Sequence, residues 1–119
     1  MLNKNQLCIV SYEQAKRLKK AGYIWNAFAP NNWYDPMDGK LNHGNLYPLE
    51  YYPAPTVSLA LKWFRDEKGI PNAVCIKDCN GKFESYYISP SENCDYFTTY
   101  ESAESALLDE LLNILEKEQ

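Results

Sequence analysis

Four cysteines and one histidine are the residues of this chain whose types most often bind metals or act as nucleophiles. Three residues separate Cys75 from Cys79, and 14 residues separate Cys79 from Cys94. The second tight Cys or His pair that closed zinc sites usually show is missing. Nothing indicates export, so we expect reduced thiols, with Cys8 and Cys75 as small buried apolar residues. We therefore predict no metal site and no cofactor.

Catalysis by the single histidine is an alternative that the sequence leaves open. His43 lies in a stretch rich in Gly and Asn, and a small hydrolase-type enzyme would need its imidazole beside a cysteine or beside Asp35 and Asp38. These two carboxylates flank a predicted turn, where Asp commonly bonds the backbone. The sequence contains no nucleotide-binding, calcium-loop or serine-hydrolase motif. No residue is therefore assigned a catalytic role.

Aromatic residues crowd the segment 23–52, which has no helical period and is interrupted by prolines. One interpretation is that these rings fill the gap between a sheet and its helices. The other is a binding surface, because Trp and Tyr dominate the hot spots of protein interfaces. We take this segment as the contact surface for a protein partner, and the residues predicted to bind are Trp25, Trp33, Tyr34, Tyr47, Tyr51 and Tyr52.

Charge is distributed unevenly along the chain, whose formal net charge is -4. Residues 1–34 hold five basic residues and one acidic residue, whereas residues 92–119 hold one lysine and eight acidic residues. Lysines beside aromatic rings suit single-stranded nucleic acid, which is a second alternative. The acidic balance disfavours it, because nucleic-acid binders usually carry a basic surplus.

Three amphipathic helices are predicted to position these residues. Each has an apolar stripe at helical spacing and a Ser or Thr at its start, and two of them end at a Gly. They cover residues 12–21, the residues between Thr56 and Gly69, and residues 100–116.

Strands are predicted around two turn signals, Asp38-Gly39 and Asn80-Gly81. The second signal predicts strands 73–77 and 83–89 joined by a turn over 78–82. Further short strands are expected at 7–10 and 96–97. The predicted fold class is α+β, a single small domain over residues 1–119 with an antiparallel sheet and three helices in the order β-α-ββ-α-ββ-α.

Length and composition set outer limits on this interpretation. A chain of 119 residues with 45% apolar residues can bury a real core and is not wholly disordered. It has no apolar run long enough for a membrane span and no apolar segment typical of a signal peptide near its start, so we expect a cytoplasmic protein.

Three segments of the sequence resemble a known group of proteins. They are SYEQAKRLKKAGY (residues 11–23), APTVSLALKWFRDEKGI (residues 54–70) and YESAESALLDELL (residues 100–112). Their order is similar to that of small uncharacterised proteins of Bacteroides-type bacteria and their phages or mobile elements. The resemblance implies a shared small α+β fold and a mobile-element origin, and it carries no catalytic residues.

The function predicted from the sequence is a non-catalytic protein-interaction or accessory module. A homodimer is expected if the broad apolar surface of the last helix is not all internal.

Overall fold

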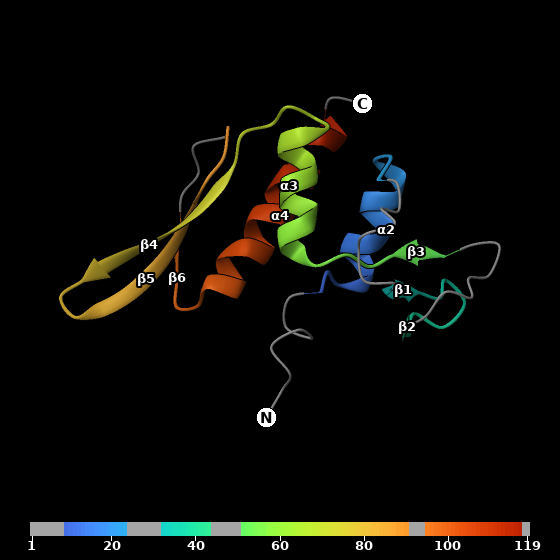
Figure 1. The fold of residues 1–119 in the computed structure, drawn as a ribbon, viewed down its shortest axis with the longest axis horizontal. Coiled ribbons are helices and arrows are strands. Elements are labelled where there is room, and N and C mark those ends of the chain that lie inside the picture. Colours follow the sequence, from blue (N-terminus) through green and yellow to red (C-terminus); the bar gives the residue numbers. More distant parts are fainter. Residues whose placement is uncertain (1–8, 24–31, 44–50, 91–94, 118–119) are drawn as a thin grey trace. The chain divides into compact units, whose positions relative to one another are not determined.

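The computed structural model describes residues 9–23, 32–43, 51–90 and 95–117, and Figure 1 shows their elements along the chain. These residues form three helices and two antiparallel sheets of three strands each. The chain groups into two compact units, residues 1–56 and residues 57–119.

Helix α2 (Tyr12–Lys20) in the first unit begins and ends where its capping residues predict. The Ser11 hydroxyl accepts a hydrogen bond from the Gln14 amide at 3.2 Å, and Gln14 Oε1 accepts one from the Ser11 amide at 2.9 Å. This capping box satisfies two amides at the helix start. At the other end Gly22 has φ of +98°, a left-handed conformation that glycine adopts without strain.

The sheet of the first unit has the strand order β2-β1-β3, with β1 (Asn32–Tyr34) in the middle, β2 (Leu41–His43) on one side and β3 (Tyr52–Pro53) on the other. Helix α2 packs against β3. The strand order makes β3 an edge strand of this sheet, and this edge strand lies beside α2.

The turn between β1 and β2 uses its two aspartates as predicted. Asp35 Oδ1 accepts a hydrogen bond from the Met37 amide at 2.8 Å, and Asp38 Oδ1 accepts one from the Lys40 amide at 2.9 Å. Each carboxylate thus binds a backbone amide two residues farther on, the usual role of Asp in turns.

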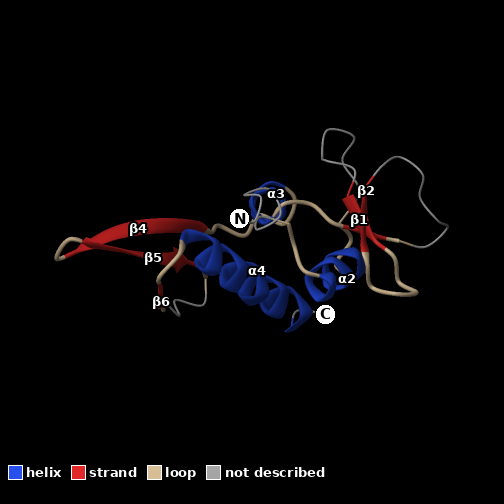
Figure 2. Ribbon diagram, turned by 90° about the horizontal axis from the view of Figure 1, so that it is seen from below, coloured by secondary structure: helices blue, strands red, loops and turns tan. Residues whose placement is uncertain are grey.

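The second unit is built from helices α3 (Val57–Asp66) and α4 (Tyr100–Lys117) and from the strands β4 (Ala73–Cys79), β5 (Lys82–Ile88) and β6 (Tyr96–Phe97). Its sheet has the order β4-β5-β6. Helix α4 contacts all three strands as well as α3, and Figure 2 shows α4 beside the sheet.

The hairpin of β4 and β5 has a longer first strand and a tighter turn than the sequence predicts, and its second strand begins and ends one residue earlier than predicted. Asn80 and Gly81 are the only residues between the paired Cys79 and Lys82, and their φ angles are +55° and +84°. Two positive φ values in a two-residue loop define the type I′ turn, whose twist matches that of the flanking strands. The predicted turn over 78–82 is therefore too wide.

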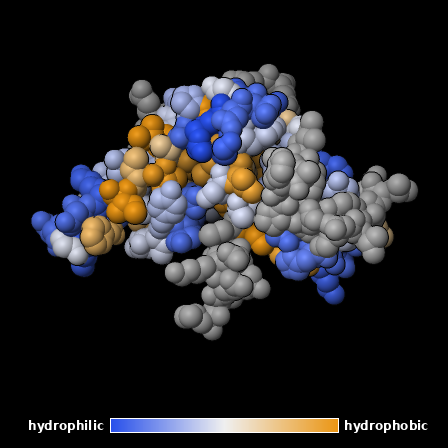
Figure 3. Space-filling model, viewed as in Figure 1, coloured by the Kyte–Doolittle hydropathy of each residue, from blue (hydrophilic) through white to orange (hydrophobic). Residues whose placement is uncertain are grey.

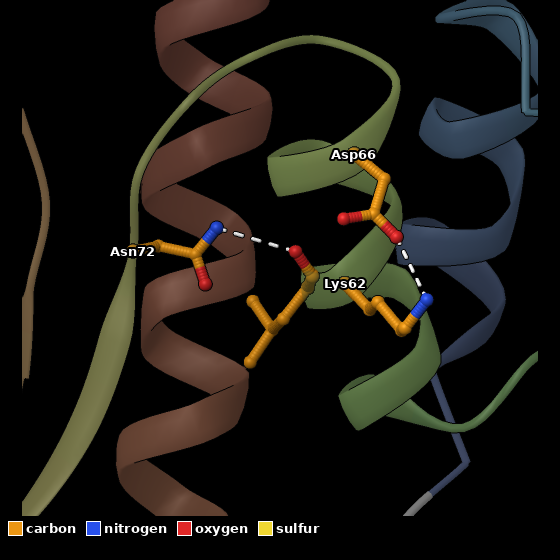
Figure 4. A network of polar contacts seen from close by, with 4 residues as sticks. Lys62, Asp66 and Asn72 are labelled. Carbon is orange, nitrogen blue, oxygen red and sulfur yellow. Dashed lines mark hydrogen bonds and ion pairs between the residues drawn. The ribbon is translucent and has the colours of Figure 1, made fainter.

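A buried asparagine just before β4 bonds to the middle of α3 and to the segment that follows the helix (Figure 4). Asn72 Nδ2 donates hydrogen bonds to the carbonyl oxygens of Leu61 and Ile70, both at 3.2 Å. On the outer side of the helix, Lys62 Nζ lies 2.7 Å from Asp66 Oδ2, and this hydrogen bond lowers the pKa of the Asp66 carboxyl. Asn72 is buried, whereas Lys62 and Asp66 are both exposed.

The apolar stripes of α3 and α4 form the core of the second unit. The apolar stripe of α3 is buried in full, and all five leucines of α4 are buried as well. The prediction of a homodimer therefore gains no support from α4. The buried residues of the two helices are Val57, Ala60, Leu61, Phe64, Ala103, Glu104, Leu107, Leu108, Leu111, Leu112 and Leu115.

Within the described residues, the α+β class, the three helices and the antiparallel pairing are confirmed, but the strands form two sheets instead of the single sheet predicted. Of the strand predicted at residues 7–10, only Ile9 and Val10 are described. Ile9 forms an isolated bridge with Thr56. No helix of the described residues is long and apolar enough to cross a membrane.

Candidate functional site

Four of the six residues predicted to bind are described, and all four lie in the first unit. Trp33, Tyr34, Tyr51 and Tyr52 are each half-buried, so they are neither core residues in full nor freely exposed. Trp25 and Tyr47 lie outside the described residues.

Tyr34 and Tyr52 pair across β1 and β3 and form a ring cluster with Tyr12 of α2. The ring centroid of Tyr12 lies 5.7 Å from that of Tyr34 and 5.6 Å from that of Tyr52, both in edge-to-face geometry. Such aromatic pairs stabilise beyond the area that they bury. This cluster attaches the start of α2 to the sheet.

Within the cluster, Tyr34 has a structural role. Its hydroxyl donates a hydrogen bond to the carbonyl oxygen of Val10 at 2.7 Å, and burial raises the pKa of this phenol. Of the four described residues predicted to bind, Tyr34 therefore fits the core interpretation best, because its polar end is already used inside the unit.

Lys19, on the last turn of α2, fixes the edge of the sheet at β3. Its Nζ donates a hydrogen bond to the carbonyl oxygen of Tyr51 at 2.8 Å, and it lies 5.6 Å and 5.4 Å from the ring centroids of Tyr51 and Tyr52. An ammonium within about 6 Å of a ring centroid is attracted to the aromatic face. The contact joins residues 32 positions apart.

Trp33 and Tyr51 form a second pair of rings. Their centroids lie 6.5 Å apart at an interplanar angle of 74°. In the register of the sheet, Trp33 pairs with Pro53 and Tyr34 with Tyr52, and neighbouring residues of a strand point to opposite faces. Trp33 therefore lies on the face of the sheet opposite Tyr34 and Tyr52. We call Lys19, Tyr51 and Tyr52 the tyrosine surface.

His43 is exposed at the end of β2, and its Nδ1 contacts the side-chain oxygen of Asn32, with which it is paired in the sheet. Asp35 and Asp38 each bind a backbone amide of the turn instead. Among the described residues His43 therefore contacts an amide oxygen, and no contact joins it to either carboxylate considered from the sequence.

The cysteines give no metal site within the described part of the chain. No three Cys, His, Asp or Glu side chains there form a group that could hold a metal ion. Cys75 is a free, half-buried thiol in β4, and Cys79 is the last residue of that strand. Cys8 and Cys94 lie outside the described residues.

Sequence reasoning missed an apolar surface on the β4–β5 hairpin. Ile76 is 61% exposed and Phe83 is 69% exposed, and Figure 3 shows orange surface among blue over this hairpin. The register places both side chains on the same face as Tyr87, which is buried and bonds to Glu110 of α4. The alternation of side chains along the two strands predicts that this whole face is buried. A sequence pattern does not show how far a helix covers the face.

Comparisons of the chain with protein-family models, with curated proteins and with solved structures gave no match. The function is therefore argued from the geometry of the tyrosine surface.

Proposed function

We propose that the chain is a non-catalytic protein-interaction module whose contact surface is the tyrosine surface. The observation that carries this proposal is the fixed position of Lys19 over the half-buried rings of Tyr51 and Tyr52. Rings held in place before binding lose little conformational freedom when a partner docks, which favours affinity.

The chemistry of these side chains suits a protein partner. Tyr and Trp combine a large apolar area with a polar end, and a few such residues carry most of the binding free energy at interfaces. Because a half-buried ring is held by its neighbours, its exposed part faces a partner in a defined orientation. The origin in Bacteroides-type bacteria or their mobile elements stays a prediction.

Single-stranded nucleic acid is the second candidate, favoured by the ammonium of Lys19 beside two aromatic rings. The net charge of -4 opposes it. In addition, residues 1–56 hold six basic against four acidic residues, which is a small surplus for binding phosphates.

Capture from a bacterial lysate by immobilised protein tests the proposal. The variant Tyr51→Ala Tyr52→Ala is compared with Tyr96→Ala, which removes an exposed tyrosine of β6. We expect the wild type and Tyr96→Ala to capture the same protein band and the double variant to lose it, while circular dichroism shows all three folded.

Two results would contradict the proposal. In the first, the double variant captures the same band as the wild type. In the second, the captured material is nucleic acid that nuclease treatment removes. If the double variant unfolds, the single variant Tyr51→Ser repeats the test, since Tyr51 lies just before β3.

A further inference from the structure

We infer that the tyrosine surface binds an acidic peptide segment of its protein partner, with the lysines of α2 as the anchors for carboxylates. This inference rests on the proposed function and adds the chemistry of the partner to it.

Three lysines of α2 form one outward face of the helix. Lys16, Lys19 and Lys20 are exposed, whereas the buried residues of the helix are Ala15, Leu18 and the capping Gln14. Positions three and four apart are neighbours on a helix surface, so Lys16 lies beside both Lys19 and Lys20. The exposed Glu13 lies on the same side of the helix, three residues before Lys16, so the face carries a net positive charge of two next to the tyrosine surface.

The ammonium group of Lys19 can donate further hydrogen bonds to an anionic group. An ammonium has three N–H donors, and one of them is used on the carbonyl oxygen of Tyr51. The other two remain for an incoming carboxylate, at a position that the rings of Tyr51 and Tyr52 help to fix. Because the side chain is already held, binding costs less ordering than it would at a freely moving lysine.

Charge complementarity selects the class of partner. Three positive charges between Lys16 and Lys20 match two or three carboxylates on an extended peptide, and the tyrosine rings match apolar side chains between those carboxylates. A long polyphosphate chain would need a larger basic surface than these residues form. An acidic segment with interleaved apolar residues is therefore the ligand that fits best.

Binding of a defined peptide tests the inference. The probe is a fluorescein-labelled decapeptide of alternating glutamate and leucine, followed by fluorescence anisotropy at low salt, with a matched peptide in which glutamine replaces glutamate. We expect only the acidic peptide to bind, with amide shifts in NMR confined to α2 and residues 51–53. Raising the salt concentration weakens binding, since exposed charges are screened.

The variant Lys16→Gln Lys20→Gln keeps helix propensity while removing two charges beside Lys19. Its affinity for the acidic peptide falls about fivefold, as expected for two exposed charge pairs. The matched control Lys82→Gln Lys117→Gln removes two exposed charges of the second unit and leaves the affinity unchanged.

Several results would overturn the inference. These are equal binding of the glutamine peptide, no binding of the acidic one, and an unchanged affinity of the α2 variant. Tighter binding of a ten-nucleotide oligothymidine would make the ligand nucleic acid, and a salt-sensitive dimer without peptide would make it a second copy. If Tyr51→Ala Tyr52→Ala still abolishes capture of the protein band while the peptide results fail, the proposed function stands and only the acidic partner is wrong. A nucleic-acid ligand would contradict both.

Discussion

Replacement of Lys19 by methionine tests whether this lysine is a fixed part of the fold or a solvated surface charge. Methionine has nearly the same helix propensity, so the change removes mainly the ammonium. Two exposed cation–π contacts contribute about 0.5 kcal/mol each, and the hydrogen bond to the Tyr51 carbonyl contributes up to about 1 kcal/mol. We expect Lys19→Met to lower the free energy of unfolding of the first unit by about 1–2 kcal/mol.

Lys20→Met is the matched control, because it removes the same charge from the same exposed turn. A surface change without a specific contact shifts stability by less than about 0.5 kcal/mol. Urea unfolding followed through the amide resonances of α2 and β1 reports on this unit alone. Equal midpoints for the two variants would refute the reasoning, and so would a wild-type midpoint for Lys19→Met.

Two further predictions concern a buried asparagine and a half-buried tyrosine. Asn72→Ala removes two hydrogen bonds to backbone carbonyls and should lower the free energy of unfolding by about 2 kcal/mol. Lys62→Gln breaks an exposed ion pair and should leave the urea midpoint unchanged. A larger loss of stability in Lys62→Gln than in Asn72→Ala would contradict this account. Burial raises the pKa of the Tyr34 phenol in the folded state. The unfolded state therefore loses the phenol proton first, at about pH 10. The stability that the protonated phenol contributes is complete below that pH and is lost as the pH rises through the pKa of the folded state. Tyr34→Phe should therefore be less stable than the wild type at pH 8 and should lose less stability between pH 8 and pH 11, which urea unfolding at the two pH values checks.

The elements of this fold that depend on local sequence are those that could be predicted. The helix α2 begins directly after Ser11 and ends before Gly22, and both positions follow from capping chemistry within a few residues. The turn at Asn80-Gly81 follows from the preference of these residues for positive φ. Each of these signals lies inside the segment that it shapes.

Features that depend on distant contacts could not be predicted in the same way. The strand β3 has only two residues and ends in proline, so it has no strand pattern of its own and depends on pairing with β1. For the candidate site, the aromatic composition indicated the segment, but the separate roles of Tyr34 and Tyr51 depend on a bond to Val10 and on the position of Lys19. These contacts join residues 24 and 32 positions apart.

The most direct test of the proposed function is site-specific photocrosslinking in cells, with p-benzoylphenylalanine at position 51 in one variant and at position 96 in another. Both positions hold tyrosine, so the substitution is similar in size at each site. The proposal predicts a discrete light-dependent adduct with one partner protein from position 51 and none from position 96. An adduct from position 96 alone, or none from position 51, would contradict it.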